Sequence, residues 1–269
     1  WEPKSKSVAR GEQTLELDSG KLTESSGLVF SRVNDTCIWS HNDSGGKARL
    51  YAFDEKGESC GRLTLEDASA VDWEDIAGYT DEVPRLLIAD VGDNQARRDT
   101  VSLYLIDEPD PTEKTESAAY QHLKVRYEDG SRNCESVAVE MSNRRILLVS
   151  KSPLGASLHE VPLPPRSTDD GPVHLDVVAK RIGSLPLPMA TGMDLDPSSG
   201  DLWVTSYFQA FCFRGPEPIE DRIKTTPEGF KLPRLKQIEA IAVDGNGRVW
   251  VTSEGKPTKM RRVMTVDSQ

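Results

Sequence analysis

Five positions along the chain carry oxygen-bearing side chains of the kind that hold a hard metal ion, and each lies in the same local pattern. A short polar or acidic start is followed by an apolar strand, a turn and a second apolar strand, as in ESSGLVFS then CIWSHND. Successive copies are 48, 61, 56 and 48 residues apart, which suits one four-stranded blade with its loops, so the segments are internal repeats. Aligning the copies on the residue two places before the first apolar position selects Ser26, Glu74, Glu135, Thr191 and Glu239.

These five positions, called here the ring residues, predict a calcium site. Three glutamates around one axis repel one another and raise one another's pKa unless a cation lies among them. Calcium takes six to eight oxygens at about 2.3 to 2.6 Å, which three carboxylates, two hydroxyls and waters can supply. Magnesium needs stricter octahedral geometry, and zinc favours nitrogen or sulfur. The alternative is that these polar residues only solvate the mouth of a channel.

A second set of polar residues follows the second strand of the first two repeats. In a blade whose first two strands are antiparallel, the start of the first strand and the end of the second lie at the same mouth. Carboxylate and imidazole groups there could act as general acid and base in hydrolysis of a glycoside, lactone or phosphoester. The alternative is that they bind their own backbone in turns. The catalytic candidates are His41, Asp43, Asp90 and Asp93.

Basic and aromatic residues expected at the same mouth, from the second to the fifth repeat, suggest that the mouth binds a ligand. Cations there could bind phosphate oxygens beside a calcium ion that polarises the phosphoryl group, and an aromatic ring could stack on a base or sugar. The competing interpretation is an ordinary charged surface, since loops are generally solvated. The ligand-binding candidates are Trp73, Arg97, Arg98, Lys151, Tyr207 and Lys256.

The distribution of strands predicts an all-β fold, a single five-bladed β-propeller. Short β-branched and aromatic runs separated by turn residues recur along the whole chain. The fifth repeat has too little chain for four strands, whereas the N-terminus carries an unassigned strand, EQTLELD, over Glu12–Asp18. Pairing that strand into the last blade closes the ring and removes an exposed edge. Six blades or a β-sandwich are the alternatives.

The repeat spacing also sets expected blade boundaries within this single domain. They are 23–67, 70–129, 132–186, 188–235, and 236–269 together with 10–20. The Pro- and Glu-rich stretch Glu108–Glu116 is expected to be a solvated loop within the second blade.

Charge and hydropathy exclude several classes of protein. With 33 basic and 44 acidic residues the net charge is -11, which argues against a nucleic-acid polymer as partner. The longest apolar runs, such as Leu86–Ala89, fall far short of the roughly 20 residues of a membrane-spanning helix. No HExxH, Walker A, GxSxG or GxGxxG motif occurs. A small-molecule or anionic ligand is therefore the expected partner.

The start of the chain bears on the compartment. The sequence begins at Trp1 without an apolar segment behind a basic one, and an oxygen-only calcium site suits millimolar calcium. We expect a secreted or periplasmic protein whose signal peptide is not part of this sequence.

The four cysteines lack CxxC spacing and are expected to be free thiols, with a bridge between Cys134 and Cys212 as the alternative.

The order of the ring residues carries a family resemblance. Ser, Glu, Glu, Thr and Glu, one per blade, resemble the central calcium site of the soluble calcium-activated nucleotidases, an apyrase family of the secretory pathway. The resemblance implies that all five ring residues are calcium ligands, with Thr191 replacing a serine but keeping its hydroxyl. The segments ESSGL, HNDSGG, DWEDIA and DVGDN also resemble secreted bacterial propeller proteins of unassigned function.

Together these observations predict a calcium-binding β-propeller with a ligand-binding mouth around a central metal. If the protein is an enzyme, the expected activity is calcium-dependent hydrolysis of a phosphoester or nucleotide. Two alternatives stay open: a non-catalytic binding or adhesion propeller with a purely structural calcium, and a hydrolase of the lactonase or glycosidase type.

Overall fold

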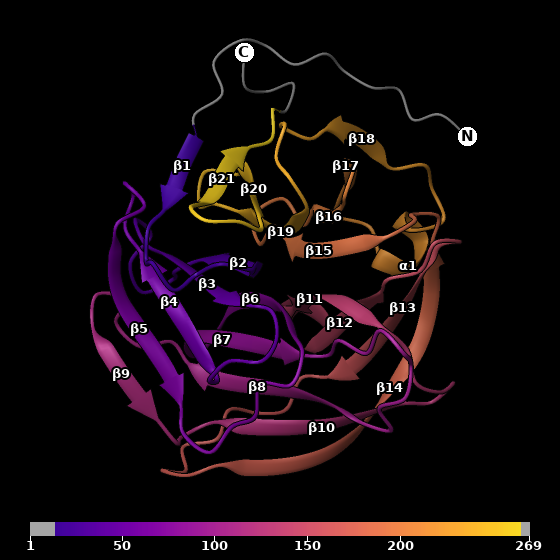
Figure 1. The fold of residues 1–269 in the computed structure, drawn as a ribbon. Helices are drawn as coiled ribbons and strands as arrows, with labels where there is room; N and C mark the ends of the chain where they lie inside the picture. Colours follow the sequence, from indigo (N-terminus) through magenta and orange to yellow (C-terminus); the bar gives the residue numbers. More distant parts are fainter. Residues whose placement is uncertain (1–13, 265–269) are drawn as a thin grey trace.

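The computed structural model describes residues 14–264, and its regular structure is almost entirely β (Figure 1). The helical segments in this range are a 3-10 turn, Met141–Asn143, and one short helix, α1 (Ile219–Arg222). None of the described helices is long and apolar enough to cross a membrane. The all-β prediction is confirmed.

The strands of residues 14–264 form four hydrogen-bonded sheets. The first sheet contains β2 (Ser25–Phe30), β3 (Ile38–Asn42), β4 (Arg49–Phe53), β5 (Ser59–Leu65) and β9 (Lys114–Ser117). The second contains β6 (Trp73–Asp81), β7 (Val83–Asp90), β8 (Val101–Asp107), β10 (Gln121–Tyr127), β11 (Cys134–Glu140), β12 (Arg145–Ser150), β13 (Ala156–Pro162) and β14 (Val173–Leu185). The third contains β15 (Ala190–Leu195), β16 (Leu202–Ser206), β17 (Gln209–Phe213) and β18 (Glu228–Lys231). The fourth contains β1 (Thr14–Leu17), β19 (Ile238–Val243), β20 (Val249–Ser253) and β21 (Thr258–Arg262).

The strands that open the five sequence repeats lie at the centre of the molecule. Each packs against the next along the chain, and β19 packs against β2, so that β2, β6, β11, β15 and β19 surround the centre (Figure 1). Buried apolar clusters fill the spaces between neighbouring sheets, as where Trp39 and Leu50 of the first sheet meet Leu86 and Tyr104 of the second. This radial arrangement is consistent with a β-propeller.

The predicted pairing of the N-terminal strand is present. Strand β1 pairs antiparallel with β21, from Thr14 opposite Arg261 to Leu17 opposite Thr258. The first two residues of the predicted strand, Glu12 and Gln13, lie outside the described residues. Leu17 is 1% exposed and packs in the cluster that contains Leu28 and Met260. The fourth sheet therefore joins the two ends of the described chain.

The outer rim contains two parallel pairings that the sequence did not predict. Strand β9 adds to the outer edge of β5, and the first half of β14 runs beside β10, which joins two sheets into one (Figure 1). The prediction of a solvated loop over Glu108–Glu116 is thus wrong at its end, because Lys114–Ser117 is a strand. Outer strands present unpaired backbone groups, and these pairings cover them.

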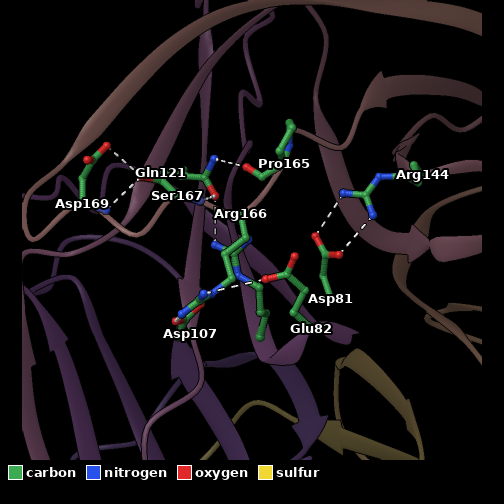
Figure 2. Close-up of polar contacts among 10 residues, drawn as sticks. Asp81, Glu82, Asp107, Gln121, Arg144, Pro165, Arg166, Ser167 and Asp169 are labelled. Atoms are coloured by element: carbon green, nitrogen blue, oxygen red, sulfur yellow. Dashed lines mark hydrogen bonds and ion pairs between the residues drawn. The ribbon is translucent and has the colours of Figure 1, made fainter.

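Ion pairs fasten the connection after β13 to the second sheet. Figure 2 shows Arg166 beside Asp107, with its Nε 3.0 Å from both carboxylate oxygens. Gln121 Nε2 donates to the carbonyl of Pro165 at 2.9 Å. These contacts hold the connection against the strands that it crosses.

Two carboxylates, the buried Asp75 and the half-buried Asp194, serve the free inner edges of the central strands. Asp75 Oδ2 accepts the backbone N–H groups of Val137 in β11, at 2.9 Å, and Met193 in β15, at 3.4 Å. Asp194 Oδ2 accepts the N–H of Val243 in β19 at 2.7 Å. Both side chains therefore replace the strand that an inner edge lacks.

The described cysteines Cys37, Cys60, Cys134 and Cys212 are all free, as expected, and Cys60 is half-buried while the other three are buried.

The closing strand provides a test of the fold. Leu17→Ala is expected to lower the free energy of unfolding by about 3 kcal/mol, because it removes buried apolar atoms from the last sheet. The neighbouring Glu16→Ala, on the exposed side of β1, should change it by no more than about 0.5 kcal/mol. Urea unfolding measures both values, and equal effects would contradict the role given to Leu17.

Asp194 predicts a pH-dependent stability. Burial raises the pKa of Asp194 from 3.8 to about 6, so the folded protein binds this proton more tightly than the unfolded chain. The free energy of unfolding should therefore rise as pH falls from 7 to 4, by about 2.5 kcal/mol from this group. Asp194→Asn carries no charge, so its stability advantage over the parent protein should shrink by that amount across the same range.

Asp196 provides the matched control. Burial acts to raise the pKa of Asp196, but hydrogen bonds from Ser198 and Ser199 outweigh it and lower that pKa. Its contribution to stability is therefore lost at low pH, and Asp196→Asn should show the opposite trend. A pH-independent difference between Asp194→Asn and the parent protein would refute the assignment.

Candidate metal and ligand site

Each ring residue lies at a register irregularity of its central strand, and the irregularity is at the equivalent position in all five strands. In each case the register with the second strand skips one residue, as where Trp73 faces Asp90 and Asp75 faces Ala89. A β-bulge of this kind turns the extra residue out of the ladder and aims its side chain in a new direction. The skipped residues are Ser26, Glu74, Glu135, Thr191 and Glu239, and all five are buried.

The two ring hydroxyls bind the neighbouring central strand. Ser26 Oγ donates to the carbonyl of Glu74 at 2.9 Å and lies 3.4 Å from Glu74 Oε2. Thr191 Oγ1 donates to the carbonyl of Ile238 at 3.1 Å. Both hydroxyls thus link adjacent strands of the centre, and Ser26 also lies beside a ring carboxylate.

Three carboxylates come together at the seam between the first two repeats. Asp43 follows β3, Asp72 precedes β6, and Glu74 lies within β6. One oxygen from each lies within 4.8 Å of the other two. The backbone fixes this arrangement, because the N–H of Trp73 donates to the carbonyl of Asp43 at 3.2 Å. We call Asp43, Asp72 and Glu74 the carboxylate cluster.

Two features of the carboxylate cluster fit a bound cation. Asp43 Oδ1 is buried and accepts no hydrogen bond within the described residues. Gly92 leaves room for the other two carboxylates, since a Cβ atom there would lie 2.3 Å from Glu74 Oε1 and 2.4 Å from Asp72 Oδ2. Oxygen donors with an unsatisfied buried atom suit a hard cation such as calcium.

The electrostatics of the carboxylate cluster favour a positive partner. Burial, followed by the charges of Glu135, Asp43 and Asp72, raises the pKa of Glu74 to about 10. Burial and the neighbouring Asp72 raise the pKa of Asp43 to about 7. Burial also raises the pKa of Asp72. Each shift reflects the cost of placing negative charges close together with little water.

The neighbouring part of the ring, on the other side of Glu74, already holds a cation of its own. Glu135 accepts hydrogen bonds from Lys151 Nζ at 2.8 Å and Asn133 Nδ2 at 2.7 Å. Lys151 Nζ also lies 4.9 Å from the ring centre of Tyr207. Burial raises the pKa of Glu239 to about 7. Glu135 and Glu239 therefore lie near Lys151 and outside the carboxylate cluster.

The other three catalytic candidates, His41, Asp90 and Asp93, are each held by hydrogen bonds to the backbone around them. His41 is fully buried, its Nδ1 lies 3.0 Å from the carbonyl of Asn42, and burial lowers its pKa to about 4. Asp90 accepts the N–H of Asp72 at 3.1 Å and pairs with Arg98 at 2.8 Å. Asp93 accepts the N–H of Arg98 at 2.8 Å. Asp90 thus positions the segment that carries Asp72.

The ligand-binding candidates are divided between the core and the surface. Trp73 is 1% exposed and donates through Nε1 to the carbonyl of Ser69. Arg98 is engaged by Asp90, while Lys151 and Tyr207 are half-buried beside the ring. Arg97 and Lys256 are exposed, and Lys256 Nζ reaches the carbonyl of Gly20 at 3.0 Å.

Sequence reasoning missed Asp72 and Gly92. A signal for Asp72 was present, because the residue two places before the ring position is polar in four of the five repeats. That second column of the alignment contains Glu24, Asp72, Asn133, Met189 and Gln237. No comparable signal identified Gly92, whose importance depends on how closely two side chains approach it.

The fold and site together define a protein with a β-propeller arrangement and a cluster of carboxylates at one mouth. No protein-family profile and no curated protein matches the sequence. Among solved structures, a glucose dehydrogenase is 11% identical, covers 94% of this chain and 99% of its own, and has a TM-score of 0.56.

Two further solved structures differ in description but share the fold. A gluconolactonase from Xanthomonas campestris is 13% identical over 94% of this chain and 90% of that chain, with a TM-score of 0.52. A chain of a nidogen/laminin complex is also 13% identical, over 86% of this chain and 72% of that chain, with a TM-score of 0.52. At these identities the likeness concerns the fold alone, and function must be argued from the site.

The role of Asp90 is testable by stability. Asp90→Asn is expected to lower the free energy of unfolding by about 3 kcal/mol, since it breaks a buried ion pair and weakens the support of the Asp72 segment. Asp99→Asn, an exposed neighbour in the same loop, should change it by no more than about 0.5 kcal/mol. Urea unfolding of both variants decides, and a neutral Asp90→Asn would disprove the assigned role.

Proposed function

We propose that this chain is a five-bladed β-propeller that binds calcium at one mouth and hydrolyses a small anionic substrate there, with phosphoesters and nucleotides as the first class to test. Each central strand begins one blade in this proposal, within the boundaries expected from the repeats. The observation that carries it is the carboxylate cluster, with the unsatisfied Asp43 Oδ1 and the space left by Gly92.

Calcium is proposed over other ions because of the donor set. Asp43, Asp72 and Glu74 offer carboxylate oxygens, the Ser26 hydroxyl lies beside Glu74, and waters can complete six to eight ligands. The resemblance of the ring order to calcium-activated nucleotidases supports the same ion. Because Lys151 engages Glu135, we propose that calcium lies toward the carboxylate cluster rather than on the axis of the ring.

The surrounding residues suit an anionic substrate. When bound, calcium supplies Lewis-acid polarisation of a substrate oxygen. Lys151 adds a second positive charge at the same mouth, and exposed Arg97 can reach substrate oxygens. Tyr207 beside Lys151, together with Phe208, which is 75% exposed, offers aromatic surface for a base or sugar. A secreted or periplasmic location would supply the millimolar calcium that such a site needs.

One observation favours a second candidate, a non-catalytic binding propeller in which calcium only stiffens the fold. The carboxylate cluster spans two sheets, because Asp43 follows a strand of the first and Glu74 belongs to the second. An ion there would fasten these sheets together whether or not a substrate binds.

Calcium binding is the first test. Calorimetry on chelator-stripped protein should detect about one bound calcium ion, and Gly92→Ala should weaken binding at least about tenfold, because its Cβ would displace the ligands. Gly46→Ala is the matched control, since nothing lies within 4 Å of a Cβ at that position. Absence of calcium binding to the parent protein would overturn the proposal.

The activity is tested separately. Nucleotides, p-nitrophenyl phosphate and lactones are incubated with the protein, with and without calcium. Calcium-dependent phosphoester hydrolysis that Glu74→Gln abolishes is the expected result. Turnover of lactones alone would replace the substrate class. Calcium binding and thermal stabilisation without turnover of any of these would favour the non-catalytic propeller.

A further inference from the structure

Strands β10 and β14 run side by side at the outer rim (Figure 1), and their parallel junction brings two histidines together. His122 and His174 are direct register partners, and both lie on the more exposed face of their strands. Their Nδ1 atoms are 3.0 Å apart. At that distance two neutral imidazoles share one proton, which one ring donates to the lone pair of the other.

The His122 ring is held in position by its neighbours. It stacks on Tyr104 with ring centres 4.9 Å apart and planes inclined by 17°. Its second nitrogen, Nε2, lies 2.9 Å from Ser102 Oγ. When Nε2–H donates to this hydroxyl, Nδ1 carries the lone pair that faces His174. Metal-binding histidines typically have such a partner for the distal N–H.

The charge state of His122 suits coordination at neutral pH. Burial, followed by the charge of His174, lowers the pKa of His122, so that its neutral form is favoured. Asp90, Lys124 and Asp176 are the other charged groups that act on His122. Asp176 lies two residues beyond His174 on the same exposed face of β14.

We propose that His122 and His174 form a two-nitrogen site for a divalent transition metal, with Cu²⁺ bound most tightly. With metal–nitrogen bonds of about 2.0 to 2.1 Å, nitrogens 3.0 Å apart subtend about 95° at the metal. That angle is close to the roughly 90° between neighbouring ligands in the tetragonal sites that Cu²⁺ and Ni²⁺ adopt. The metal takes the place of the shared proton, which is released, and waters occupy the remaining positions.

A metal at this place would fasten the junction between two blades. The junction consists of the seven register pairs from Gln121 opposite Val173 to Tyr127 opposite Ala179, and the histidines are the second of these pairs. Because a ligand that binds only the folded protein stabilises it, occupancy should raise the melting temperature. This site is independent of the carboxylate cluster, which lacks nitrogen ligands.

The test uses chelator-stripped protein without a polyhistidine tag, titrated with Cu²⁺ in a non-coordinating buffer with calcium in excess. Calorimetry should show one tight Cu²⁺, electron paramagnetic resonance should show two coupled nitrogens, and the melting temperature should rise. His174→Gln should weaken binding at least about tenfold, since loss of one of two ligands costs at least as much as loss of an outer-shell partner. Because His174 is exposed, this substitution should leave the fold intact.

Lys180→Gln, an exposed change on the same strand, is the matched control and should bind Cu²⁺ as the parent does. Equal affinity of His174→Gln and the parent, or coupling to fewer than two nitrogens, would overturn the proposal. Because excess calcium competes for the carboxylate cluster throughout, failure here leaves the proposed function untouched, and a protein that binds no calcium can still bind Cu²⁺ at the histidines.

Discussion

The free inner edges of the central strands impose the constraint on which the rest of the structure depends. A central strand has a hydrogen-bonded partner on one side only, and its other edge faces a buried centre where unpaired N–H groups are costly. Asp75 meets this need for β11 and β15 at once, and Asp194 meets it for β19. Glu74 directly precedes Asp75, so the carboxylate of the candidate site stands on the same rigid strand.

Charge compensation divides the mouth into two unequal parts. Lys151 donates to Glu135, so that this part of the ring carries its own counter-charge. At the seam between the first two repeats, Asp43, Asp72 and Glu74 lie together, and burial raises the pKa of each. Glu135 and Glu74 occupy equivalent positions in neighbouring central strands, yet Glu135 pairs with a lysine while Glu74 lies among other carboxylates. Their chemistry differs because their surroundings differ, not because of residue type.

Local patterns in the sequence predicted the elements that repeat. The positions of the five ring residues were found from the repeat spacing, because each repeat must position equivalent residues alike. The closing strand was found because the fifth repeat is too short for four strands and the N-terminus carries an unassigned one. The parallel pairings at the rim were not found, since the pairings of β9 with β5 and of β14 with β10 have no counterpart in the other described sheets.

The surroundings of single residues were equally beyond the sequence. His41 and Asp90 lie in turn-rich polar segments that look solvated, yet both are fully buried by neighbouring sheets. The approach of Glu74 and Asp72 to Gly92 likewise depends on tertiary contacts between two loops. Sequence patterns gave residue types at the site, whereas burial and mutual distance came only with the assembled fold.

Closure of the last sheet by β1 has a consequence for synthesis on the ribosome. Strand β1 precedes all the other described strands in the chain, whereas its partner β21 follows all of them. While the intervening blades form, β1 must wait with an open edge and an exposed apolar residue at Leu17. The nascent chain is therefore exposed to wrong partners at this edge until β21 has been synthesised.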